Sequence, residues 1–118
     1  MVSREARDET AAELFALTRQ IADAELRPKV AEAEREGYFP HAEFRTLGKA
    51  GLLSLPFPEE YGGGGQPYET YLQVVEELAT AWLAVGLGVS VHTLSCFPIA
   101  TAGTDAQRTR WLPDMLGG

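Results

Sequence analysis

Residues 78–104 read LATAWLAVGLGVSVHTLSCFPIATAGT, and no charged side chain occurs between Glu77 and Asp105. A segment this poor in charge must be hidden from water, either in a bilayer or inside a protein. About 20 apolar residues suffice to cross a membrane, but glycine, serine and threonine interrupt this segment repeatedly. The nearest flanking charges are acidic, whereas Lys or Arg usually anchors a membrane span. We therefore expect no membrane span but the central helix of a soluble domain, packed on most sides by other helices.

The composition is that of a single acidic domain. The 118 residues suit one domain, and 45% hydrophobic and 23% charged residues are typical of globular proteins. The net charge of −7 disfavours nucleic acid as a partner, because binding it needs clustered Lys and Arg. Cys96 is the only cysteine, which excludes an intrachain disulfide and a cysteine-rich zinc site. The charged N-terminus is unlike a secretory signal, and we expect a cytoplasmic, bacterial protein.

Helical periodicity dominates the N-terminal half. Apolar residues recur at three- and four-residue steps over residues 8–36, which predicts a long amphipathic helix with a kink or a break at Pro28. Pro40 is placed to start a short second helix that stops at Gly51. Residues 52–66 lose this periodicity. We expect their first half to run extended and largely covered, and the four glycines that follow to form a structured loop.

A third helix precedes the uncharged one. Pro67 suits its start, and an apolar stripe that includes Tyr68 and Leu72 recurs at helical spacing. The same spacing places Glu77 on the solvated side. A short bend at residues 82–84 is then expected to lead into the uncharged helix.

The last helix begins with a capping signal. Thr104 is followed three residues later by Gln107, which is the spacing of a capping box, and Trp111 is expected to face inward. No stretch alternates like a strand. The sequence therefore predicts an all-α, up-and-down bundle-like domain of about five helices that spans residues 1–118, with residues 1–8 disordered.

The glycine run at residues 62–65 invites comparison with a phosphate-binding loop. Such a loop needs a strand before it, a helix N-terminus after it and, in the P-loop, a Gly-Lys-Ser/Thr sequence. Here Gly65 is followed by Gln66 and Pro67, and no Lys or Arg is near. We interpret the run as permissive backbone in tight turns.

His92 and Cys96 lie four residues apart, which places them on the same face of the uncharged helix. A Cys–His pair could form an activated thiolate or contribute two metal ligands. No third group occurs at helical spacing, and apolar burial makes a thiol inert. The intermediate reading is a pocket wall, in which His92, Thr93 and Cys96 provide a polar patch on an apolar helix. The residues alone leave these readings open, with no complete catalytic set.

Four segments in order carry a family resemblance. Residues 58–65, PEEYGGGG, resemble the P-x-x-Y-G-G-x-G loop of the acyl-CoA dehydrogenases. Residues 51–55, GLLSL, are similar to the end of that family's second helix, and residues 76–79, EELA, follow at the right distance. Residues 103–115, GTDAQRTRWLPDM, resemble its G-[ST]-x-x-Q-[KR]-x-x-[WY]-L-P-x-[LM] segment. The resemblance extends over nearly the whole chain.

The resemblance implies an α-helical N-terminal domain of a larger flavoenzyme, which continues with a middle β domain and a C-terminal helical bundle. Such enzymes bind FAD, assemble as homo-oligomers and dehydrogenate an acyl-CoA substrate in fatty acid metabolism. A carboxylate removes the α-proton, the β-hydrogen passes to the flavin, and an electron-transfer flavoprotein accepts the electrons. By the same resemblance, His92, Thr93 and Cys96 would face the acyl chain.

The resemblance also assigns no catalytic, cofactor-binding or metal-binding residue to this chain. The family's flavin segment and its glutamate base have no counterpart in the 118 residues, so we expect this piece alone to bind no FAD and to be inactive. We interpret the sequence as a piece of a longer protein. Two alternatives stay open: the same domain of an acyl-CoA oxidase or flavin monooxygenase, and a stand-alone helical module for dimerisation or interaction.

Overall fold

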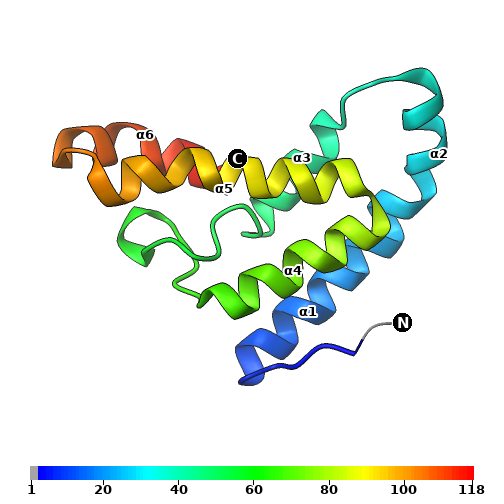
Figure 1. The fold of residues 1–118 in the computed structure, drawn as a ribbon, viewed down its shortest axis with the longest axis horizontal. Coiled ribbons are helices and arrows are strands. Elements are labelled where there is room, and N and C mark those ends of the chain that lie inside the picture. The colour runs from blue at the N-terminus through cyan, green and yellow to red at the C-terminus, as the bar shows by residue number, and fades with distance from the viewer. Residues whose placement is uncertain (1–2) are drawn as a thin grey trace.

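A computed structural model describes residues 3–118, and every regular element in this range is helical. Figure 1 shows the helices in chain order: α1 (Glu9–Ile21), the π-helical turn η1 (Ala22–Leu26), α2 (Arg27–Glu36), α3 (His41–Lys49), the 3₁₀ turn η2 (Glu59–Tyr61), α4 (Tyr68–Ala81), α5 (Leu83–Ala102) and α6 (Asp105–Gly117). Because α1, η1 and α2 follow one another without a gap, residues 3–118 form five helical rods. The all-α prediction is confirmed.

The first rod is continuous through a π-helical turn that lies just ahead of Pro28. The Asp8 carboxylate caps its start by accepting a hydrogen bond from the Ala11 N–H at 2.8 Å. At η1 the Arg27 N–H donates to the carbonyl of Ala22, five residues earlier. A proline cannot donate and crowds the carbonyl four residues before it. The wider turn accommodates Pro28 near the start of α2, so the predicted disturbance is a π-turn rather than a break.

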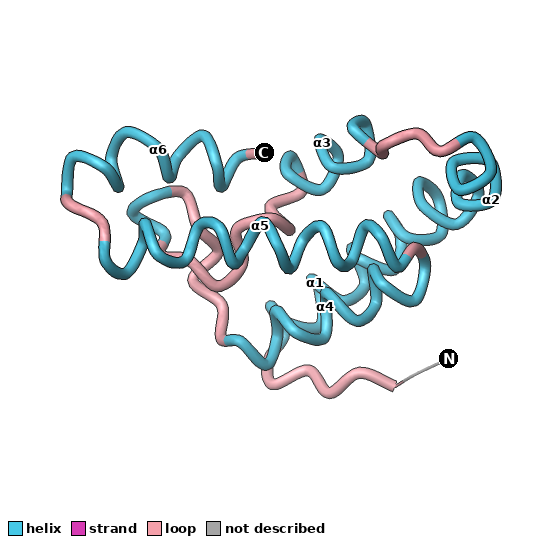
Figure 2. Tube along the Cα trace, turned by 45° about the horizontal axis from the view of Figure 1, so that its top comes forward, coloured by secondary structure: helices cyan, strands magenta, loops and turns pink. Residues whose placement is uncertain are grey.

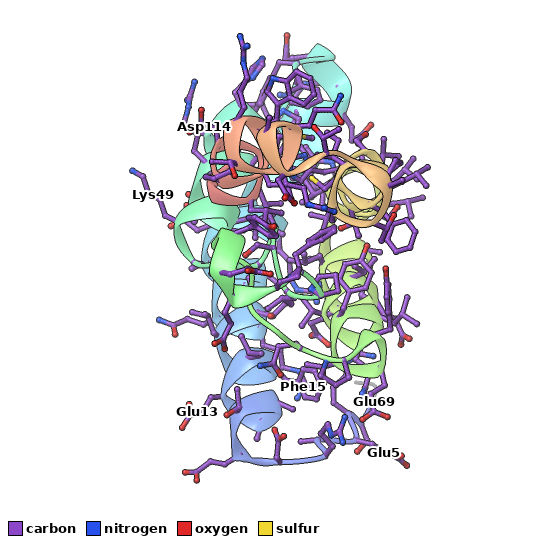
Figure 3. The ribbon with its side chains drawn as sticks, turned by 90° about the vertical axis from the view of Figure 1, so that its left-hand side faces the viewer. Glu5, Glu13, Phe15, Lys49, Glu69 and Asp114 are labelled. Atoms are coloured by element: carbon purple, nitrogen blue, oxygen red, sulfur yellow. The ribbon has the colours of Figure 1, made fainter. Side chains whose placement is uncertain are left out.

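Most of the core lies between α1, α4 and α5. Phe15 points from α1 towards the interior, whereas Glu13 points away from it (Figure 3). Helices α4 and α5 approach closely because Gly86 has no side chain: a Cβ there would lie 2.6 Å from the Cβ of Ala79. A second cluster lies where α6 packs on α5, and it comprises Phe57, Cys96, Leu112 and Leu116.

The predicted inward face of α4 is partly wrong. Tyr68 and Leu72 are exposed, at 48% and 58%, whereas Glu77 is buried at 7%. Glu77 is covered because Arg4, from the segment that precedes α1, lies over it and forms an ion pair at 2.8 Å. Arg19 adds a second ion pair from α1. A periodicity rule places a carboxylate outside, but two guanidinium groups supply the hydrogen bonds that a buried carboxylate needs.

The segment at the N-terminus lies along α4. The Glu5 N–H donates to the Gln73 side chain at 2.9 Å, and the Gln73 amide returns a bond to the Glu5 carbonyl at 3.1 Å. Figure 3 places Glu5 near Glu69, at the first turn of α4. Of residues 1–8, for which we expect disorder, residues 1–2 lie outside the described range.

The connection between α3 and α4 is a compact series of turns. Leu52, Leu53, Leu55 and Phe57 are all buried, as predicted. The extended conformation predicted for this segment is wrong, because successive turns bring Phe57 N–H to the carbonyl of Ser54 at 3.1 Å. The turns allow several large apolar side chains in a short segment to point at the core. An extended segment would alternate sides and expose half of them.

Helix α6 begins with the predicted capping box: the Gln107 N–H donates to the Thr104 hydroxyl at 3.1 Å, and the Gln107 side chain accepts from the Thr104 N–H at 2.9 Å. Leu112 is fully buried. The prediction that Trp111 faces inward is wrong, since it is 43% exposed and Arg110 lies over its ring.

Helix α5 packs against α4 and α6, but only five of its 20 residues are buried. Figure 2 shows α4 and α1 on one side of it and α3 and α6 on the other, with the remaining side of α5 uncovered. Its buried residues are Val85, Gly86, Val89, Thr93 and Cys96. The prediction that this helix is packed on most sides is therefore wrong for the described residues. By length and composition α5 is the one described helix that could cross a membrane, a test that the core helix of a soluble protein also passes.

Candidate functional site

Helix α5 exposes a continuous line of large apolar side chains, which we call the α5 stripe. Its members recur every three or four residues and are Leu83, Leu87, Val91, Leu94 and Phe97, with exposures of 72%, 60%, 51%, 69% and 45%. Single exposed apolar residues are common on protein surfaces, but a contiguous line of them marks a surface that another molecule or chain covers.

Beside the stripe, α3 and α5 enclose a groove, which we call the α3–α5 groove. Its volume is about 710 Å³, within the usual range for small-molecule sites. Its lining residues are Phe39, His41, Phe44, Arg45, Leu53, Ala84, Leu87, Gly88, Val91, His92, Ser95 and Gly118. The Phe44 ring reaches the surface of α5 because Gly88 leaves room: a Cβ at Gly88 would lie 2.4 Å from its Cζ atom.

His92 lines this groove, and a hydrogen bond fixes its ring. Nε2 lies 2.7 Å from the backbone carbonyl oxygen of Met115 in α6. A carbonyl oxygen only accepts hydrogen bonds, so Nε2 must carry the proton. The Cys96 Sγ lies 3.7 Å from the same nitrogen. Because Nε2 already donates, it cannot accept the proton of the thiol, and this geometry does not form an activated Cys–His pair.

Cys96 itself is fully buried, and burial raises the pKa of its thiol. A raised pKa keeps the thiol protonated at neutral pH, which removes the nucleophile that a catalytic cysteine needs. Among residues 3–118 no three His, Cys, Asp or Glu side chains gather into a possible metal site. The arrangement therefore favours a structural role for the Cys96–His92 contact.

Thr93 is buried on the side of α5 that faces α4. Its hydroxyl donates to the carbonyl of Val89 at 3.1 Å and forms a hydrogen bond with Tyr71. Burial raises the pKa of the Tyr71 hydroxyl, and the bond with Thr93 opposes this rise. Of the three residues expected to face an acyl chain, His92 thus borders the groove, while Thr93 and Cys96 point into the protein. Their contact with a ligand stays a prediction.

Sequence reasoning did not single out the residues that make the groove apolar. Phe39 and Phe44 stack with ring centroids 5.4 Å apart, and they face Leu87 and Val91 on α5. The two groups are more than 40 residues apart in the sequence, so no local pattern joins them. The one local signal is Gly88, a small residue amid large apolar ones, which is typical of a close approach by another element.

The glycine loop has no amide free for a phosphate. The N–H groups of Gly63, Gly64, Gly65 and Gln66 donate to the carbonyls of Pro58, Ser54, Phe57 and Leu55 at 2.8–2.9 Å. A phosphate cradle needs these N–H groups to point at the ligand. These hydrogen bonds instead hold the loop against the turns that precede η2. This agrees with the interpretation of the four glycines as residues that allow tight turns.

Comparisons with known proteins agree on one family. Residues 8–118 match the family described as acyl-CoA dehydrogenase, N-terminal domain. The chain is 32% identical over 103 residues to an acyl-CoA dehydrogenase of Bacillus subtilis, covering 86% of this chain and 27% of that protein. It is 35% identical over 101 residues to the mitochondrial short-chain specific acyl-CoA dehydrogenase of Mus musculus, covering 85% of this chain and 24% of that protein. The structure of butyryl-CoA dehydrogenase from Megasphaera elsdenii superposes with a TM-score of 0.86 at 27% identity, over 98% of this chain and 31% of that one. This chain thus spans about a quarter of the length of the relatives it matches.

Proposed function

The chain belongs to the acyl-CoA dehydrogenase family as its N-terminal domain, and from this we propose that it forms one wall of the acyl-CoA pocket of such an enzyme. The observation that carries the proposal is the α5 stripe. Five large apolar side chains stand in one line on a helix whose opposite side is packed against α4. An acyl chain needs an apolar surface of this kind, and water must be kept away from the reacting carbons.

The complete reaction would draw on parts of the protein outside these residues. A carboxylate base would remove the α-proton of the acyl thioester, and FAD would supply the chemistry that accepts the β-hydrogen as hydride. The glycine loop has no free amide to hold the pyrophosphate of FAD, so this loop does not fit that part of the cofactor. We also propose an electron-transfer flavoprotein as the electron acceptor and a homo-oligomeric assembly.

The chain's own residues then have two tasks. The α5 stripe supplies apolar contact along the acyl chain and excludes water from it. The α4–α5 hairpin fixes the position of that surface. Gly86 and Ala79 hold the two helices in close contact. At the bend between them, the indole Nε1 of Trp82 donates to Glu34 of α2 at 3.0 Å. A wall that is held rigidly contributes to catalysis by positioning the substrate.

The test uses the product of the complete gene, assayed for flavin absorbance and acyl-CoA turnover. Leu94→Lys places a charge in the middle of the α5 stripe. We expect kcat/KM to fall by at least about tenfold, because the acyl chain would then cover an ammonium group instead of an apolar side chain. Leu72→Lys is the matched control, since Leu72 is an equally large apolar residue, 58% exposed, on α4 and not a member of the α5 stripe. Its turnover should stay near that of the unmodified protein.

Two results would contradict the proposal. Equal turnover in the Leu94→Lys and Leu72→Lys proteins would show that the α5 stripe is not part of the acyl-CoA pocket. A complete gene product without bound flavin and without acyl-CoA turnover would reject the enzyme itself.

A further inference from the structure

The α3–α5 groove differs in charge from the rest of the molecule. The chain has 17 acidic and 10 basic residues, yet no acidic side chain lines this groove. Arg45 and both histidines of the chain, His41 and His92, do line it. On a protein with a net charge of −7, an apolar groove whose ionisable side chains are all basic is a local exception. Its electrostatics favour an anion, whereas most of the surface repels one.

Arg45 is available to a ligand. It is exposed at the wall of the groove, and among residues 3–118 it forms no ion pair or side-chain hydrogen bond. His41 lies four residues before it on α3, hence on the same face. The other arginines mostly have acidic partners within the chain; these are Arg4, Arg7, Arg19, Arg27, Arg35 and Arg108.

The apolar part of the groove extends along α5. Its floor on α5 extends from Ala84 to Ser95, which corresponds to roughly 16 Å at 1.5 Å per residue. Phe39 and Phe44 form the facing wall. The floor is longer than an extended decyl chain, so such a chain can lie along it within the groove.

We propose that the α3–α5 groove binds a free aliphatic carboxylate. Its carboxylate is held by Arg45 and His41, and its chain lies between Phe44 and the apolar floor formed by Leu87 and Val91. This site goes beyond the proposed function, because a free carboxylate is not a thioester and no reaction is required of it. It also differs in position: the groove extends from the α5 stripe towards α3, and the two surfaces overlap at Leu87 and Val91.

The experiment is a calorimetric titration of the 118-residue chain with decanoate, below its micelle concentration. Decanol and decyltrimethylammonium serve as ligands with the same chain but a neutral or a cationic head. We expect decanoate to bind more tightly than decanol and the cationic ligand not to bind. Octanoate should bind about four- to tenfold more weakly than decanoate, because two methylene groups are lost from a partly open groove. Raising the salt concentration should weaken decanoate binding alone.

Two variants and one control locate the site. Arg45→Gln should weaken decanoate binding by about fivefold, the upper end of what an exposed ion pair contributes, and should leave decanol binding unchanged. Arg35→Gln is the matched control, since Arg35 is exposed on α2 and pairs with its neighbour Glu36 at 3.3 Å. Leu87→Glu places an anion in the groove at a residue that is 60% exposed, and it should abolish decanoate binding without unfolding the chain. Circular dichroism verifies the fold of each variant.

Three results would overturn the proposal. These are no heat of binding up to millimolar decanoate, equal affinity for decanoate and decanol, and equal effects of Arg45→Gln and Arg35→Gln. Chemical shifts of the His41 and His92 rings that do not respond to decanoate would also reject this location. None of these results would touch the acyl-pocket proposal, which depends on the Leu94 variant in the complete enzyme.

Discussion

Removing the Arg4 side chain tests how the segment before α1 is held on α4. The guanidinium of Arg4 pairs with Glu76 at 2.7 Å and with Glu77 at 2.8 Å, and the Arg4 side chain is only 6% exposed. Breaking a buried ion pair by deleting one partner costs about 3–5 kcal/mol, because the other charge stays buried. Here Glu77 keeps Arg19 as a partner at 3.2 Å, and Glu76 is 58% exposed, where a pair contributes at most about 1 kcal/mol. We therefore expect Arg4→Ala to lower the free energy of unfolding by about 2 kcal/mol.

The assay is urea unfolding followed by tryptophan fluorescence, together with a thermal melt. For a domain of this size, about 2 kcal/mol corresponds to a fall in Tm of roughly 6–10 °C. Arg7→Ala is the matched control: Arg7 pairs with Glu69 at 3.2 Å, but both side chains are more than half exposed, so the change should stay within about 0.5 kcal/mol. A double-mutant cycle of Arg4→Ala with Glu77→Ala isolates the pair. Equal, small effects of Arg4→Ala and Arg7→Ala would refute the reasoning, as would a coupling energy near zero.

Three further predictions concern other parts of the chain. Burial raises the pKa of the Cys96 thiol, so a thiol reagent should label the unfolded but not the folded protein at neutral pH. For the same reason the free energy of unfolding should fall as the pH rises above the pKa of the unfolded thiol. Full labelling of the folded protein would contradict this prediction. Gly63→Ala should destabilise the chain by more than about 2 kcal/mol in urea unfolding, because a Cβ there would lie 2.1 Å from the carbonyl oxygen of Phe57. Gly37→Ala meets no atom within 4 Å and should cost only about 1 kcal/mol of left-handed strain, so equal losses would reject the steric reason. The 118-residue chain should bind a hydrophobic dye or self-associate in gel filtration through the α5 stripe, and Leu94→Lys should reduce this while Leu72→Lys does not; a monomer that binds no dye would contradict it.

The ends of the helices could be predicted from the sequence because they depend on neighbouring residues. The capping box of Thr104 and Gln107 lies within four residues, and Gly51, two residues after the end of α3, adopts a left-handed φ of 79°. Pro28 also had a local effect, although its form was not predictable: whether a proline breaks a helix or is taken up by a π-turn depends on the packing around it. Here the buried Ala22 and Leu26 keep the helix continuous on the core side.

The buried charge and the groove could not be predicted in the same way, because both depend on segments far apart in the sequence. Glu77 is buried by Arg4, which lies 73 residues earlier. The groove joins Phe44 of α3 to Gly88 of α5. Helical periodicity indicates which face of a helix a residue lies on, but not which distant group will cover it. A single sequence therefore indicates the helices more reliably than it indicates their partners.

The error about α5 has a different cause, and it bears on function. The absence of charge from residues 78–104 implies that the segment is hidden, but it does not say by what. The structure covers α5 on the side of Gly86 and Val89 and leaves the α5 stripe open. Covering its five side chains would contribute on the order of 5 kcal/mol, taking roughly 1 kcal/mol for the exposed part of each. That is comparable to the whole stability of a typical domain, about 5–15 kcal/mol. Such a surface is costly to leave in water, and for this reason we propose the α5 stripe, rather than the Cys96–His92 contact, as the feature through which this domain acts.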